Sequence, residues 1–104
     1  MKKEFKQTAV FYYEHHYAKK GDYQIHVRFP DLLALGLPAF TVGNSLEDAI
    51  EAAKEILEMM VECAEEDGIV LPDPTPIEMI QIDRGFDLDA PPFRILVEHV
   101  SIYL

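Results

Sequence analysis

The sequence predicts a single α+β domain in which one long helix packs across an antiparallel sheet. Three observations lead to this expectation. Two runs of strand-like composition stand close together near the start of the chain, a long central stretch has the apolar spacing of a helix, and a final apolar run can return to the sheet. A chain of 104 residues can bury one hydrophobic core, so we expect one domain over residues 1–104.

The first two strands are expected to form a hairpin. Residues 8–16 are rich in aromatic and β-branched side chains, which favour a strand. Residues 23–29 alternate between apolar and polar side chains, as in a strand with one buried face, and Gly21 marks the turn before them. Pro30 ends the second strand, and we expect a loop over residues 31–39.

The second half of the sheet follows from shorter signals. Residues 40–42 are a candidate third strand. The proline-rich connector at 72–76 leads into one or two helical turns through about residue 81, although this stretch could also form a strand. After a polar turn region at 83–92, residues 93–103 are apolar on both faces, which predicts a strand well inside the sheet.

The longest helix is expected over residues 46–67. Ser45, with Asp48 three residues later, forms a capping box, and Gly68 can end the helix in the left-handed conformation. Apolar residues at helical spacing form one stripe, which we expect to face the sheet: Leu46, Ala49, Ile50, Ala53, Ile56, Leu57, Met60, Val61 and Ala64. A narrower apolar set beside the stripe fits either the edge of the core or a seam for a partner: Ala52, Met59 and Cys63.

The charge of the chain is strongly negative and unevenly spread. The formal net charge is −10. Residues 1–30 hold six Lys or Arg and three Asp or Glu, whereas residues 31–104 hold three and sixteen. Such a chain repels phosphate, so we expect no direct nucleic-acid binding and favour a basic protein as partner. The alternative is that the acidity only keeps the protein soluble.

The carboxylates of the predicted helix gather on the side opposite the apolar stripe. Helical spacing places Glu51, Glu55, Glu58 and Glu62 next to one another, and like charges at this spacing cost stability. A face kept acidic in spite of this cost is the first candidate for partner binding, and a merely solvated face is the alternative. Catalysis would require carboxylates that converge in a concave site, which a convex helix face does not provide.

No catalytic, cofactor or metal motif is recognisable in the chain. His15 and His16 are adjacent on a predicted strand and point to opposite faces, so they cannot chelate one ion together. His15 and His26 could approach across the hairpin, but no third ligand is apparent. Cys63 lies among carboxylates, which oppose thiolate formation. We therefore expect no enzyme activity, no metal and no cofactor. Without a signal peptide or a membrane-spanning run, we expect a cytoplasmic protein.

Three short motifs, taken in order, resemble the HicB antitoxin family of toxin–antitoxin systems. They are Phe29-Pro30-Asp31-Leu32, the stretch Thr41-Val42-Gly43-Asn44-Ser45 before an acidic helix, and the exit Asp67-Gly68-Ile69-Val70-Leu71-Pro72. With the aromatic first strand and Gly21-Asp22-Tyr23, the resemblance covers roughly residues 8–76.

The resemblance implies a fold and a function. The fold is a three-stranded antiparallel sheet plus a returning strand, with one long helix across it, known as a partial RNase H fold. The function is binding without nuclease chemistry. The partner of such domains is HicA, a small basic toxin that cleaves mRNA, whose active surface the antitoxin covers. Self-association into a homo-oligomer is also expected.

This sequence departs from the family pattern in two places. Residues 33–39 form a longer and more apolar loop than usual, and we take Leu33, Leu35 and Leu37 as a second candidate contact. Residues 93–103 leave no room for the C-terminal DNA-binding segment that many HicB proteins carry, so we do not expect one. An orphan HicB-like domain without a toxin is therefore an alternative.

Two further functions are alternatives to protein binding. A metal-dependent ribonuclease of RNase H topology would need converging carboxylates, for which the predicted strands offer only Glu14, Glu98 and, at a strand end, Asp31. A DNA-binding regulator is opposed by the net charge of −10.

Overall fold

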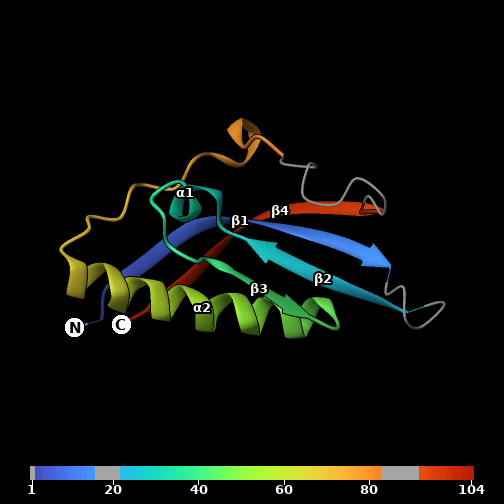
Figure 1. Cartoon of the computed structure of the whole chain (residues 1–104), viewed down its shortest axis with the longest axis horizontal. Coiled ribbons are helices and arrows are strands. Elements are labelled where there is room, and N and C mark those ends of the chain that lie inside the picture. The colour runs from blue at the N-terminus through green and yellow to red at the C-terminus, as the bar shows by residue number, and fades with distance from the viewer. Residues whose placement is uncertain (1, 16–21, 83–91) are drawn as a thin grey trace.

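One four-stranded antiparallel sheet with a long helix across one face makes up the fold (Figure 1). The computed structural model describes residues 2–15, 22–82 and 92–104. In chain order the elements are β1 (Glu4–His15), β2 (Tyr23–Arg28), α1 (Pro30–Leu33), β3 (Phe40–Gly43), α2 (Leu46–Asp67), the 3-10 helix η1 (Ile77–Met79) and β4 (Arg94–Tyr103). The expected α+β class is confirmed. The sheet has four strands in the order β3-β2-β1-β4, where three and a returning strand were expected.

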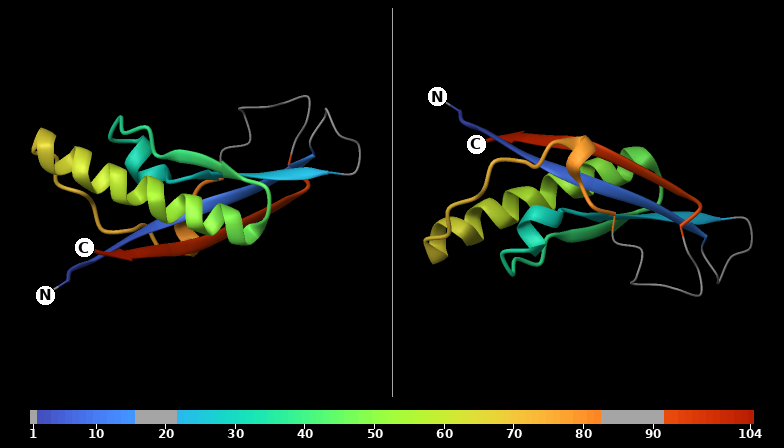
Figure 2. Two further views of the ribbon diagram at one scale, coloured as in Figure 1. Left: turned by 90° about the horizontal axis from the view of Figure 1, so that it is seen from below. Right: turned by 90° about the horizontal axis from the view of Figure 1, so that it is seen from above.

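The central strand is β1, which pairs antiparallel with both β2 and β4. Its residues 7–14 are buried on both faces of the sheet. One face meets α2, and the connector after α2 brings η1 to the opposite side of the sheet (Figures 1 and 2). Aromatic and β-branched side chains suit this two-sided burial, which explains the composition of the strand.

The last strand does not lie inside the sheet, and that prediction was wrong. β4 pairs with β1 from Glu4↔Tyr103 to Tyr13↔Arg94 and forms one edge of the sheet. The interior strands are β2 and β1, so the apolar residues of β4 report burial of its faces and not a neighbour on each side. Val100 and Ile102 are buried in the core, whereas Ile95 and Val97 on the opposite face are half-buried.

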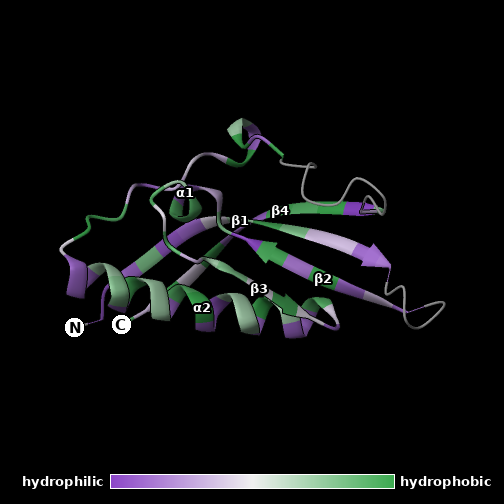
Figure 3. Cartoon of the chain, viewed as in Figure 1, coloured by the Kyte–Doolittle hydropathy of each residue, from purple (hydrophilic) through white to green (hydrophobic). Residues whose placement is uncertain are grey.

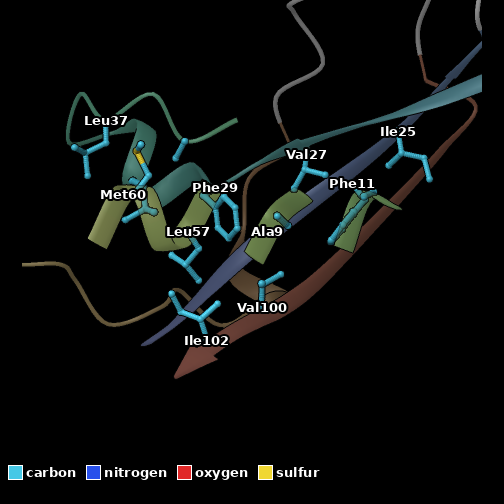
Figure 4. Packing of buried hydrophobic residues seen from close by; sticks show 14 of the residues in the cluster. Ala9, Phe11, Ile25, Val27, Phe29, Leu37, Leu57, Met60, Val100 and Ile102 are labelled. Carbon is cyan, nitrogen blue, oxygen red and sulfur yellow. The ribbon is translucent and has the colours of Figure 1, made fainter. Parts of the chain in front are cut away.

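The core lies between the sheet and α2 (Figure 4). Hydrophobic and hydrophilic residues alternate along α2 as the helix turns (Figure 3). The predicted stripe is confirmed for the six residues that are buried: Ala49, Ala53, Leu57, Met60, Val61 and Ala64. Ile50 and Ile56 are half-buried, and Leu46 at the start of the helix is 37% exposed.

Both ends of α2 match the sequence signals. The Ser45 side chain accepts a hydrogen bond from the Asp48 N–H, and Gly68 ends the helix with a φ of 69°. Before the helix, the backbone of β3 passes so close to it that a Cβ on Gly43 would collide with the backbone of Asp48 and Ala49. The glycine of the Thr-Val-Gly-Asn-Ser stretch therefore lets the helix begin directly against the sheet.

The short elements differ from the predictions. The expected loop after Pro30 begins with one helical turn, α1, for which proline at the first position is well suited. The expected one or two turns before residue 81 are only the 3-10 helix η1. The predicted turn at Gly21, His16 and almost all of the 83–92 region lie outside the described residues.

Candidate protein-binding surface

The exposed side of α2 brings the predicted acidic residues together. Glu51, Glu55, Glu58 and Glu62 are all exposed, and at 1.5 Å of rise per residue they extend over about 16 Å of helix. Lys54 is the one basic residue of α2, and the last turn holds none. Among the described residues, no ion pair engages the four carboxylates. The result is a convex surface with uncompensated negative charge, which we call the acidic face.

The apolar loop after α1 contributes less surface than its sequence suggests. Leu37 is only 6% exposed and belongs to the core, close to Met60 of α2 (Figure 4). Leu33 is half-buried and packs against the same core. Leu35 is 43% exposed and is the member of the predicted set that offers a large apolar side chain to a partner.

The narrow apolar set on α2, which consists of Ala52, Met59 and Cys63, lies between the acidic face and the core. Ile50 and Lys54 line a hollow on the β4 side of the helix. Helical geometry directs the opposite flank, with Met59 and Cys63, towards β3 and the loop after α1. Cys63 is half-buried against the core, whereas Met59 is 54% exposed. Met59 thus gives the acidic face an exposed apolar residue on one flank.

A structural role that the sequence did not reveal belongs to Asp31. Its carboxylate accepts two hydrogen bonds from Thr75, one from the backbone N–H and one from the hydroxyl, both at 2.8 Å. Thr8 in turn donates its hydroxyl to the Thr75 carbonyl. Earlier in the connector, the Gln7 amide donates to the Pro72 carbonyl at 2.8 Å. These bonds hold the connector after α2 against α1 and β1.

The carboxylates considered for a ribonuclease do not converge. Glu14 is buried and contacts His26 at 3.0 Å, on the face of the sheet away from α2. Glu98 is paired with Ala9 and therefore points to the α2 side, and Asp31 is engaged by Thr75. Within residues 2–15, 22–82 and 92–104, no three His, Cys, Asp or Glu side chains are grouped so that they could hold a metal ion.

The predicted approach of His15 to His26 across the hairpin was wrong. His15 is paired with Tyr23, whereas His26 is paired with Tyr12. Because adjacent positions of a strand alternate between the faces, the two histidines lie on opposite sides of the sheet. The His15 ring stacks on Phe93 at a centroid distance of 4.5 Å.

One tyrosine at the end of the sheet has a perturbed acidity. The Tyr103 hydroxyl donates a hydrogen bond of 3.0 Å to Glu4, and this bond together with the negative charge of Glu4 raises the pKa of Tyr103. Both residues are exposed, so the interaction lies outside any enclosed site.

Of the helices that the structure describes, none is both long and apolar enough to cross a membrane.

Comparison with known proteins supports the fold. No protein-family model matches the chain, and a search of curated proteins gives no match either. Among solved structures, the chain is similar to one described as "Toxin-Antitoxin complex from Streptococcus pneumoniae". The match covers 95% of this chain and 69% of that chain, with a TM-score of 0.71 and 22% sequence identity. A likeness at this identity shows a shared fold.

Proposed function

We propose that this protein is an antitoxin-like binding protein that neutralises a small basic toxin of the HicA type by covering its active surface. Two independent features support the proposal. The motifs of the sequence resemble the HicB family, and the fold is similar to a chain in a toxin–antitoxin complex. In this proposal the protein works in the cytoplasm, by binding and without catalysis, with a partial RNase H fold as its scaffold.

The acidic face is the observation that carries the proposal. Like charges at i, i+4, such as Glu51 with Glu55 and Glu58 with Glu62, each cost a few tenths of a kcal/mol. Carboxylates in the last turn of a helix add a similar cost, because the helix dipole favours cations there. A surface that lowers the stability of its own helix is consistent with selection for another property. Attraction of a basic partner is that property.

The contact would combine long-range charge with a small apolar border. Exposed charges mainly raise the association rate, because they steer a partner of opposite charge before contact. Affinity then depends on apolar groups that become buried, for which Met59 on α2 and Leu35 on the loop after α1 are exposed. Leu33 and Leu37 would act indirectly, by holding the loop that presents Leu35.

A cleavage assay tests the function itself. The partner is sought as the short basic protein encoded next to this gene, and its cleavage of RNA is measured with and without this protein. We expect cleavage to stop at a one-to-one ratio and the two proteins to co-elute. A toxin that cleaves at its full rate in the presence of excess folded protein would contradict the proposal.

A further inference from the structure

We propose that two copies of this chain associate through the β4 edge of the sheet, with their β4 strands antiparallel about a two-fold axis. This interface goes beyond the proposed function and does not depend on a toxin. The first observation is the open edge of β4. Among the described residues, only β1 pairs with this strand, so its other side is free to accept a partner.

The backbone of β4 can accept another strand. Lys3 and Leu104 exchange both backbone hydrogen bonds, at 2.7 and 3.0 Å, and they continue the register of β1 with β4. Because such pairs alternate along an antiparallel ladder, every second residue of β4 directs its N–H and C=O away from β1. These residues are Ile95, Val97, His99, Ser101 and Tyr103.

The two edges of the sheet are not equally protected. β3 at one edge has 4 residues, and α2 begins directly against it. β4 at the other edge has 10 residues and includes neither proline nor lysine, the residues that commonly block edge-to-edge pairing. An edge of this length and composition favours the addition of a strand.

Charge selects a second copy as the occupant. The chain has a net charge of −10, so most of its surface repels another copy. β4 contains one arginine, Arg94, and one glutamate, Glu98, and is therefore formally neutral. Lys54, the one cation of α2, and Glu98 both line the hollow at this edge. Two acidic chains can thus meet at β4 without a net excess of like charge along the strand, whereas a basic partner is drawn to the acidic face.

One register brings opposite charges into facing positions across residues 94–98 of the two copies. With the two-fold axis at Leu96, Arg94 of each copy lies opposite Glu98 of the other, and Ile95 lies opposite Val97. Opposite charges at facing positions stabilise a sheet, and like charges destabilise it. An axis at Glu98 would set two glutamates against each other, and an axis at Val97 would set Leu96 against Glu98.

An apolar hollow lies next to this axis. It has a volume of about 240 Å³ between α2 and β4, and its apolar lining includes Phe11, Leu46, Ile50, Leu96 and Val100. In the proposed register the Leu96 side chains of the two copies meet beside it on the α2 side of the sheet. The second copy would cover apolar surface that a single copy leaves open, including Leu46, which is 37% exposed.

Charge reversal tests the interface and its register. Arg94→Glu and Glu98→Arg are made separately, and the mass in solution is measured by sedimentation over a concentration series. Both side chains are exposed, so the variants should fold. We expect the wild type to dimerise and each variant to dimerise about tenfold or more weakly, because two facing pairs become repulsive. Glu58→Arg makes the same change on α2 and should dimerise as the wild type does.

Mixing the two variants gives the sharper result. Two glutamates of the Arg94→Glu variant then face two arginines of the Glu98→Arg variant. We expect the mixture to form a heterodimer more tightly than either variant forms a homodimer. Three results would overturn the proposal: a wild type that is monomeric at every concentration, single variants that dimerise as the wild type does, or a mixture that remains monomeric. The assay contains no toxin, so its outcome is separate from that of the cleavage assay.

Discussion

The two sides of α2 differ in what they do for the molecule. The side that faces the sheet is buried through Ala49, Leu57 and Ala64 and holds the layers together. The outer side has a row of carboxylates that no described ion pair neutralises and that adds nothing to the core. The buried side therefore determines whether the chain folds, and we propose that the acidic face selects the partner. Substitutions on the two sides should have separable effects.

The largest effect on stability is expected on the buried side. Leu57→Ala leaves a cavity beneath the helix and should lower the free energy of unfolding by about 2–5 kcal/mol. Glu58→Ala, one position along on the exposed side, is the matched control and should change it by no more than about 0.5 kcal/mol. Urea unfolding of the two variants measures both values. Equal losses would show that the two sides are not separate in function.

Asp31 is a carboxylate that stabilises the fold, in contrast to the carboxylates of the acidic face. Asp31→Ala removes the acceptor of two hydrogen bonds from Thr75 and should cost about 1–3 kcal/mol of unfolding free energy. Asp31→Asn retains one acceptor oxygen and should cost less. Thermal or urea unfolding tests this order, which would be contradicted if Asp31→Ala were as stable as the wild type.

The acidic face itself should be nearly neutral for stability. Replacing Glu51, Glu55, Glu58 and Glu62 by Gln removes like-charge pairs and retains good helix formers. We expect the free energy of unfolding to equal that of the wild type or to exceed it by up to about 1 kcal/mol. A loss comparable to that of Leu57→Ala would mean that the face has a structural role.

The smallest effect is expected at Tyr103. Its pKa is raised from 10.0 by Glu4, so its hydrogen bond contributes below pH 10.0 and is lost as the pH rises through the higher folded value. Tyr103→Phe should therefore be slightly less stable than the wild type at neutral pH, and it should lose this disadvantage in strong alkali, where Glu4 repels the charged tyrosinate of the wild type. Unfolding of both proteins across this pH range provides the test, and a constant difference would contradict it.

The parts of the fold that could be predicted are those with local signals. α2 was predicted to the residue because a capping serine, a 3.6-residue apolar period and a final glycine all lie within the helix or next to it. The place of β4 was missed because an apolar strand reports how its faces are buried and not which strands flank it. The contact of Asp31 with Thr75 joins residues 44 positions apart and leaves no local pattern.

In the candidate surface, too, local spacing predicted one part and tertiary packing determines the other. Helical periodicity was enough to place the four carboxylates together. It could not tell which leucines of residues 33–39 are exposed, because Leu37 is drawn into the core by contacts with distant elements. The direction of a loop side chain depends on tertiary packing, whereas the face of a helix follows from spacing alone.

The central claim is that the acidic face steers a basic partner to this protein. The most direct test is the association rate of the basic partner with the wild type and with the four-Gln variant, each at low and high salt. We expect the variant to associate more slowly and to show a weaker dependence on salt, because exposed charges act through screened long-range attraction. If the two proteins associate at the same rate with the same salt dependence, the acidic face is only a solvated surface and the claim is wrong.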